Sequence, residues 1–170
     1  MAQLRILTYP HPALKAKAEP IATVTDEIRA LAADMAETMY HASGVGLAAN
    51  QIGVLKRIFV IDTAQEDEPS ELRTFINPEI LELDGEQIYG EGCLSFPGAA
   101  EDIKRAERVL VRALDLDGKP FELEATGLLA VAIQHENDHL NGVLMIDKVG
   151  PLKRRKISRQ VQRAVAEASE

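Results

Sequence analysis

The segment LLAVAIQHENDH, Leu128 to His139, joins a continuous apolar run to a cluster of chemically active side chains. Its first half is apolar all round a helical turn, so a helix here must be buried. Just before it, residues 121–125 alternate between apolar side chains and glutamates, which is typical of a half-buried strand. The sequence therefore predicts a strand followed by a buried helix, which begins at about Thr126 and ends near Gly142.

Separate helices and short strands are predicted around this segment. Residues Thr25–Ala42 carry apolar side chains at helical spacing, and from Pro151 onward Ile157, Val161 and Val165 recur at spacings of four. The extended stretches are Arg57–Asp62, Thr74–Ile80, Ile88–Tyr89 and Arg108–Leu114, the last of which turns back at Asp117-Gly118. We predict an α+β fold in which short antiparallel strands and hairpins pack around the buried helix, with a C-terminal helix.

The composition is that of one soluble domain over residues 1–170. The chain has 170 residues, of which 46% are hydrophobic and 27% are charged, and this length matches one ordinary domain. The longest strictly apolar run, Leu128–Ile133, is too short to span a bilayer, and the N-terminus lacks the apolar stretch of a signal peptide. The single cysteine, Cys93, suits a reducing compartment. We therefore expect a cytoplasmic protein without membrane attachment.

Charge is unevenly distributed along the chain. The formal net charge is −8. Residues 151–170 hold six basic and two acidic side chains, a net charge of +4, which leaves −12 on the preceding 150 residues. The acidic body argues against general nucleic-acid binding. The tail is expected to form a basic C-terminal helix, and such a charge run is more often a solvated face than a binding surface.

Residues His135 to His139 have the form H-E-x-x-H, the strongest chemical signal in the chain. Histidines four residues apart share one face of a helix, so both imidazoles can reach one metal ion. Glu136 lies about 100° further round the helix and can face a metal-bound water as general base. The motif predicts a metal site with His135 and His139 as ligands and Glu136 beside it.

A catalytic metal site of this kind needs a third protein ligand and an open position. No suitably placed histidine follows the motif, and the only later glutamates, Glu167 and Glu170, lie in the basic tail. His11 and His41 remain open as alternatives from dissimilar contexts. Cys93 is the best candidate on chemical grounds, because a thiolate binds tightly beside two imidazoles.

The stretch GVGLAANQIG, Gly44 to Gly53, is a further feature. It superficially fits a dinucleotide-binding fingerprint, but it follows a helix and runs toward a strand, whereas that fingerprint needs the opposite order. Its glycines allow another backbone to come close, and Gln51 carries an amide that can donate to an oxyanion. On spacing alone, a simple helix-to-strand turn is an equally good interpretation.

Three segments, in this order along the chain, resemble the peptide deformylase family. GVGLAANQ, EGCLS (Glu91 to Ser95) and QHENDH match the three signatures of that family, and the opening ILTYPHPAL and the LDLDG hairpin fit as well. The resemblance covers nearly the whole chain. It implies a metal-dependent hydrolase that removes the formyl group from the N-terminal formyl-methionine of new bacterial polypeptides and releases formate.

The resemblance also implies roles for individual residues. The roles are metal binding for Cys93, His135 and His139, general acid/base catalysis for Glu136, and oxyanion stabilisation for Gln51 and the backbone N–H of Leu94. The metal implied in the cell is Fe(II), with Zn, Ni or Co as substitutes, although a His₂Cys ligand set by itself suits several ions.

The substrate site follows from the same resemblance. The residues implied for the methionine pocket are Val45, Tyr89, Leu128, Val131 and Ala132, and for each of them ordinary core packing is the alternative interpretation. The peptide would add as an extended strand along Val45-Gly46, with Gly44 beside it. The implied partners are N-formylmethionyl nascent peptides. Since deformylases act on chains leaving the ribosome, we also put forward the hypothesis that the basic helix contacts the ribosome, and we expect a monomer.

Two other interpretations remain open at this point. An H-E-x-x-H metallopeptidase shares the metal chemistry, but it would need a third ligand downstream of the motif. A non-enzymatic, metal-stabilised interaction module would need a fourth protein ligand. The presence of Glu136 and Gln51 favours catalysis over both.

Overall fold

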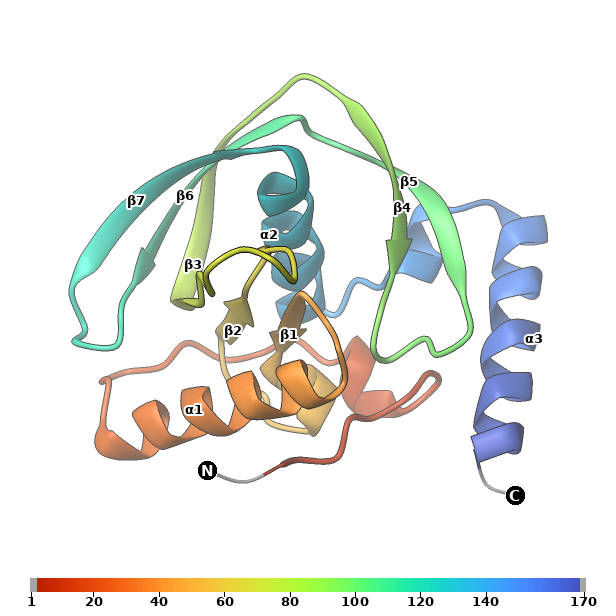
Figure 1. Cartoon of the computed structure of the whole chain (residues 1–170), viewed down its shortest axis with the longest axis horizontal. Helices are drawn as coiled ribbons and strands as arrows, with labels where there is room; N and C mark the ends of the chain where they lie inside the picture. Colours follow the sequence, from red (N-terminus) through yellow and green to blue (C-terminus); the bar gives the residue numbers. More distant parts are fainter. Residues whose placement is uncertain (1–2, 169–170) are drawn as a thin grey trace.

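A five-stranded antiparallel sheet forms the largest layer of the structure (Figure 1). The computed structural model describes residues 3–168. In spatial order the strands are β1 (Gly46–Ala48), β2 (Ile58–Ile61), β3 (Arg73–Asp84), β6 (Arg108–Leu114) and β7 (Pro120–Thr126). The predicted hairpin is confirmed as β6–β7, which pairs Arg108 with Thr126 at one end and Leu114 with Pro120 at the other.

A two-stranded ribbon, β4 (Gln87–Gly92) with β5 (Ala100–Arg105), continues the central strands of the sheet. The β3–β6 ladder ends where Asp84 pairs with Arg108, and the β4–β5 ladder begins with Gln87 and Arg105. Between them the chain bends at Gly85, whose φ of +70° favours glycine. Figure 1 shows the ribbon passing over the N-terminal end of α2 (Gly127–Leu140). The bend therefore brings the end of β4 toward this helix.

Residues 3–168 contain three α-helices, and all three were predicted. They are α1 (Asp26–His41), α2 (Gly127–Leu140) and α3 (Pro151–Ala168). Thr25 caps α1, since its hydroxyl accepts a hydrogen bond from the N–H of Ile28. Residues 169 and 170 of the predicted C-terminal helix lie outside the described residues. The predicted α+β class is confirmed.

Three apolar clusters hold these elements together. One joins α2 to the sheet around Phe59, Phe75 and Ile133, and a second joins α1 to the opposite face. The third packs α3 against the loop after β4, with Ile157 and Val161 buried. Val165, at the same spacing, is 36% exposed, so only the first part of the predicted apolar stripe is buried.

The end of α2 depends on a close backbone approach at Gly142. Its φ of +74° lies in the left-handed region, and a Cβ built there would overlap the carbonyl of Lys15. Glycine is the residue that tolerates both constraints. The backbone at Lys15 therefore packs directly against the end of α2.

Several elements were not predicted from the sequence. They are the strands β1 and β5 and the 3₁₀ turns η1 (Pro12–Lys15), η2 (Ala49–Ile52) and η3 (Met145–Lys148). Within residues 3–168, no helix combines the length and the apolar character needed to cross a membrane.

Candidate active site

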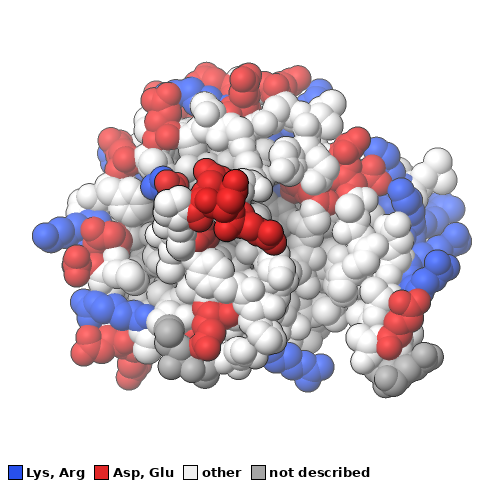
Figure 2. Space-filling view, in the orientation of Figure 1, with Lys and Arg blue, Asp and Glu red and all other residues white. Residues whose placement is uncertain are grey.

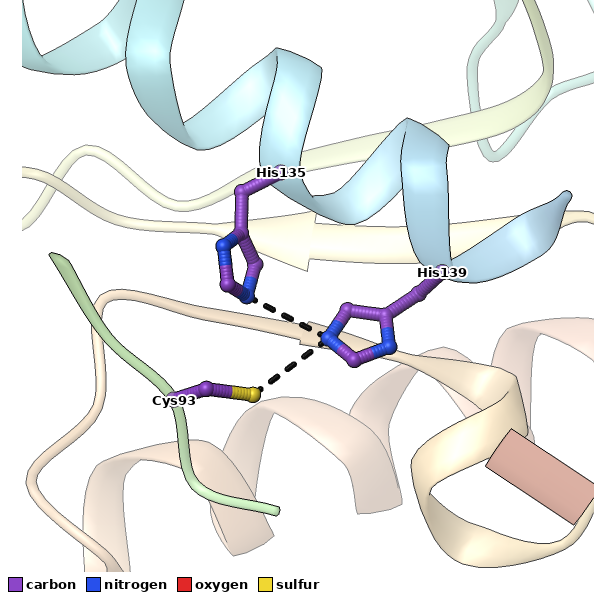
Figure 3. A group of neighbouring side chains, drawn as sticks. All are labelled: Cys93, His135 and His139. Atoms are coloured by element: carbon purple, nitrogen blue, oxygen red, sulfur yellow. Dashed lines mark hydrogen bonds between the residues drawn. The ribbon is translucent and has the colours of Figure 1, made fainter. Parts of the chain in front are cut away.

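Helix α2 presents the H-E-x-x-H side chains from a buried position. His135 is 7% exposed, Glu136 is 4% exposed and His139 is 1% exposed. The two histidines lie one turn apart on the same face, as the i, i+4 spacing requires. Figure 3 shows both rings projecting from α2 toward Cys93, which approaches on the loop after β4.

The donor atoms of these three residues converge on one point. His139 Nε2 lies 3.2 Å from His135 Nε2 and 3.4 Å from Cys93 Sγ, and all three donor atoms lie within 4.8 Å of one another. Ligand bonds of about 2.0–2.3 Å in tetrahedral geometry place neighbouring donors about 3.3–3.7 Å apart. The separations and the donor types therefore fit one divalent metal ion. His11 and His41, the alternative third ligands, do not belong to this group.

A buried ion network holds the ring of His135 in place. Its Nδ1 lies 2.8 Å from Glu91 Oε1. Because a carboxylate only accepts, Nδ1 carries a proton, and this hydrogen bond orients the ring so that Nε2 faces His139 and Cys93. Glu91 in turn accepts two hydrogen bonds from Arg105, which also contacts Asp138 at 2.6 Å. The network ties the β4–β5 ribbon to α2 at the metal site.

The charges around the histidines favour a cation. Burial lowers the pKa of His135, but the negative charges of Glu136 and Cys93 and the hydrogen bond to Glu91 raise it well above its usual value. Burial lowers the pKa of His139, and the positive charges of His135 and Arg105 lower it further. A site that favours positive charge and offers a neutral imidazole is suited to a metal ion.

Glu136 has the properties of a proton-transfer group. Burial raises its pKa to about 7, in spite of the opposing charge of His135. Its Oε1 is buried and has no hydrogen-bond partner among the described residues. A carboxyl group with a pKa near neutrality can both accept and release a proton at physiological pH.

The amide of Gln51 is oriented by its own backbone segment. The N–H of Ala48 donates to Gln51 Oε1 at 2.9 Å, so Nε2 points toward the site. Nε2 donates to Ser95 Oγ at 3.0 Å and lies 3.5 Å from Cys93 Sγ. The amide thus places its N–H groups next to the Cys93 sulfur, where a developing negative charge can be stabilised.

A cavity of about 390 Å³ opens beside these groups. The predicted site residues that line it are Gly44, Val45, Gly46, Gln51, Tyr89, Cys93, Leu94, Leu128, Val131, Ala132, His135 and Glu136. The remaining one, His139, completes the donor group behind the cavity. The structure therefore brings together the residues implied for catalysis, metal binding and substrate binding, while His11 and His41 lie outside this group.

Gly46 in β1 lies close to α2, and Gly44, just before the strand, lies close to the loop after β4. A Cβ built on Gly46 would lie 2.5 Å from Glu136 Oε2, and one built on Gly44 would lie 2.6 Å from Leu94 Cδ1. Glycine at these two positions allows the backbone to form one wall of the cavity.

Sequence reasoning did not assign roles to Glu91, Arg105 or Asp138. Glu91 and Asp138 lie inside quoted motifs, and the general need of a metal-bound histidine for a carboxylate partner could have pointed to one of them. Arg105 has no local signal, because its partners come from β4 and α2. Two further residues were missed: Ser95, which accepts a hydrogen bond from Gln51, and Phe96, which lines the cavity.

Comparison with known proteins gives concordant results. The model of the family described as "Polypeptide deformylase" matches residues 3–155. The chain is 53% identical over 165 residues to a peptide deformylase of Alkalilimnicola ehrlichii, covering 97% of this chain and 92% of that protein. The crystal structure of a peptide deformylase from Legionella pneumophila superposes with a TM-score of 0.95 at 44% identity, covering 99% of both chains. A peptide deformylase from Ehrlichia chaffeensis in complex with actinonin gives a TM-score of 0.91 at 38% identity, over 96% of this chain and 98% of that one.

The metal-donor group beside a buried glutamate and an oriented amide defines a metal-dependent hydrolase. More particularly, the chain belongs to the polypeptide deformylase family. It is an enzyme that removes the formyl group from the N-terminal formyl-methionine of newly made polypeptides. This assignment favours deformylation over the metallopeptidase and the interaction module.

Proposed function

We propose that Cys93, His135 and His139 bind the metal ion and that Glu136 transfers the protons of the reaction. The observation that carries this proposal is the buried Glu136 carboxylate at the cavity, beside the three converging donor atoms. One of its oxygens has no hydrogen-bond partner within residues 3–168. When bound, the ion would supply positive charge that polarises the formyl group and acidifies a water. Fe(II) is the proposed ion in the cell, and Zn, Ni or Co would fit the same donors.

The chain's own groups perform the remaining steps. Glu136 takes a proton from the attacking water and later delivers it to the departing amine, so formate and a free N-terminus result. The Gln51 amide and the N–H of Leu94 donate to the oxyanion that forms on the formyl carbon. Because the formyl carbon carries only hydrogen, a close-walled site admits it and excludes bulkier acyl groups.

The cavity residues bind the substrate in this proposal. The methionine side chain would occupy the apolar pocket lined by Val45, Tyr89, Leu128, Val131 and Ala132. The peptide would pair as an extended strand with the main chain of Val45 and Gly46. Main-chain pairing explains how one enzyme can process polypeptides of different sequence.

The setting of the enzyme is also part of the proposal. We place it in the cytoplasm, since a free thiol ligand such as Cys93 requires reducing conditions. One chain contains every residue of the proposed site, which is consistent with a monomer. We further propose that the basic face of α3 contacts the ribosome, and Figure 2 shows basic side chains along this edge of the molecule.

Formate release tests the role of Glu136. Protein purified without oxygen and loaded with Fe(II) or Ni(II) should release formate from formyl-Met-Ala-Ser. Glu136→Gln should lower kcat by about 10²–10⁴-fold, the range for loss of a general acid/base, while metal content stays at one ion per chain. Activity in Glu136→Gln close to that of the wild type would contradict the assigned role.

A further inference from the structure

A buried carboxylate outside the cavity, Asp62, follows directly after β2. Its side chain is 7% exposed, and none of the ion pairs among the described residues includes it. Asp62 Oδ2 accepts hydrogen bonds from Tyr40 Oη at 2.6 Å and Ser70 Oγ at 2.7 Å. Oδ1 accepts from the N–H of Ala64 at 3.0 Å, and the N–H of Glu71 lies 3.2 Å from both oxygens. Neutral donors thus hold this anion.

These bonds join three segments of the chain at one point. Tyr40 lies in the last turn of α1, and Ala64, Ser70 and Glu71 belong to the acidic loop, residues 63–72. Figure 2 shows acidic side chains gathered over this loop in the middle of the visible face. The backbone N–H of Asp62 donates to the carbonyl of Val45 at 2.8 Å. Asp62 therefore links α1 and the acidic loop to the start of the cavity wall.

The segment from Ser43 to Gly46 lies between Asp62 and the active site. It leaves α1 through Ser43, whose φ of +59° is unusual for a non-glycine residue. Its other side faces the site, because Gly44 lies against Leu94 and Gly46 lies against Glu136. A three-residue strand has little pairing of its own to fix it. The hydrogen bonds at Asp62 therefore help to hold this segment in place, on the side that faces away from the metal donors.

Both terminal atoms of the side chain at position 62 must be hydrogen-bond acceptors, because the groups around them are donors. The N–H groups of Ala64 and Glu71 can only donate, and the hydroxyls of Tyr40 and Ser70 donate to the remaining positions. Asparagine has the same shape, but one of its two terminal groups is a donor. Asp62→Asn would therefore weaken the support without leaving a cavity in the core.

We propose that Asp62 is a positioning residue for peptide binding: it fixes the main chain of Val45 and Gly46 so that the peptide beyond the formyl-methionine can pair with it. This inference rests on the proposed function, in which the substrate lies along Val45-Gly46. Asp62 is not one of the metal donors and does not itself line the cavity. Its loss should therefore act on KM for longer substrates and leave the chemical step intact.

Steady-state kinetics of the metal-loaded enzyme on two substrates test the proposal. For formyl-Met-Ala-Ser, Asp62→Asn should raise KM by about 5–10-fold, the equivalent of one or two weakened hydrogen bonds, with kcat within about twofold. For formyl-methionine amide, which lacks the downstream peptide, KM should change by less than about twofold. Tyr40→Phe removes one donor from a half-exposed side chain and should raise KM for the longer substrate by about 2–3-fold.

The control variant is Asp67→Asn, which removes an exposed charge from the acidic loop without touching the donors around Asp62. Its KM and kcat for both substrates should equal those of the wild type. This result would distinguish the positioning role of Asp62 from a general effect of the negative charge of the loop. Equal losses on both substrates, a fall in kcat alone, or unchanged KM in folded Asp62→Asn would overturn the proposal. If Asp62→Asn does not fold, unchanged KM in Tyr40→Phe overturns it equally. Failure of the wild type to release formate from either substrate would instead refute the proposed function.

Discussion

At the scale of single residues, Asp62 predicts a specific loss of stability in acid. Burial raises its pKa, but the hydrogen bonds from Tyr40, Ala64, Ser70 and Glu71 outweigh burial and lower the pKa from 3.8 to about 2. A pKa depressed in the folded state gives stability that is complete above about pH 5 and is lost as the pH falls through 3.8 toward 2. The difference corresponds to about 2 kcal/mol.

Urea unfolding at pH 6, 4 and 2.5 measures this contribution. The wild type should be more stable than Asp62→Asn at pH 6, and the difference in unfolding free energy should shrink as the pH falls from 4 to 2.5. A difference that stays constant over this range would show that the charge of Asp62 does not contribute.

Residues differ in how far the sequence alone can identify them. His135, Glu136 and His139 lie within one helical turn of each other, so local spacing determines their shared face. Cys93 could be selected by its chemistry, because the two histidines lacked a third ligand. Glu91 and Arg105 could not be paired in this way, since their contact depends on the register of the β4–β5 ribbon. The importance of Asp62 likewise depends on donors from distant segments.

At the scale of elements, the contact between β1 and α2 predicts that one substitution can lower activity while leaving the stability of the fold nearly unchanged. In Gly46→Ala the new Cβ would lie 2.5 Å from Glu136 Oε2, the far end of a flexible side chain. The side chain can rotate away at little cost to the fold, but the carboxylate then leaves its working position. We expect kcat to fall by about 10-fold or more, with the thermal midpoint changed by only a few degrees.

The matched variant for this experiment is Gly44→Ala, which meets the side chain of Leu94 instead. Its loss of kcat should be clearly smaller, because Leu94 contributes a backbone N–H to the proposed mechanism rather than its side chain. Comparable kcat losses in both variants, or a large loss of thermal stability in Gly46→Ala, would contradict the argument.

Elements with a strong periodic pattern were predictable and those without one were not. Helices α1 and α2 and the β6–β7 hairpin follow from apolar spacing and from the Asp117-Gly118 turn. Strand β5 reads AEDIKR, with only Ile103 and Arg105 buried, so its hydrophobic signal is weak. Strand β1 has three residues, all buried, and such a short run has no measurable period.

At the scale of the whole molecule, the sequence predicted the class of the fold but not how its two sheets are connected. The ribbon that carries Cys93 to α2 is an extension of β3 and β6 beyond a bend at Gly85. Only the glycine marks this bend in the sequence, where it reads as an ordinary turn. The distance from Cys93 to the histidines therefore depends on long-range pairing that composition and local motifs do not encode.

The charge asymmetry of the molecule leads to a prediction about α3. Lys153 and Lys156 pair with Glu101, while Arg155, Arg159 and Arg163 line an outward-facing groove of the helix. Removing the whole helix would be a poor test of ribosome contact. Its buried residues cover the apolar cluster around Phe96, close to Cys93, so truncation would disturb the active site as well.

Substitution of the three arginines by glutamine keeps the helix and removes only its outward charge. If these side chains contact phosphate groups of ribosomal RNA, the triple variant should co-sediment more weakly with ribosomes. The slope of log affinity against log salt should fall by about two to three, since each of the three lost phosphate contacts contributes about 0.7–0.9. The rate on formyl-Met-Ala-Ser should be unchanged, because none of the three residues lines the cavity.

A control variant with Arg29, Arg73 and Lys119 changed to glutamine has the same net charge and should co-sediment like the wild type. Equal co-sedimentation of the α3 variant and the wild type at every salt concentration would exclude α3 as the contact.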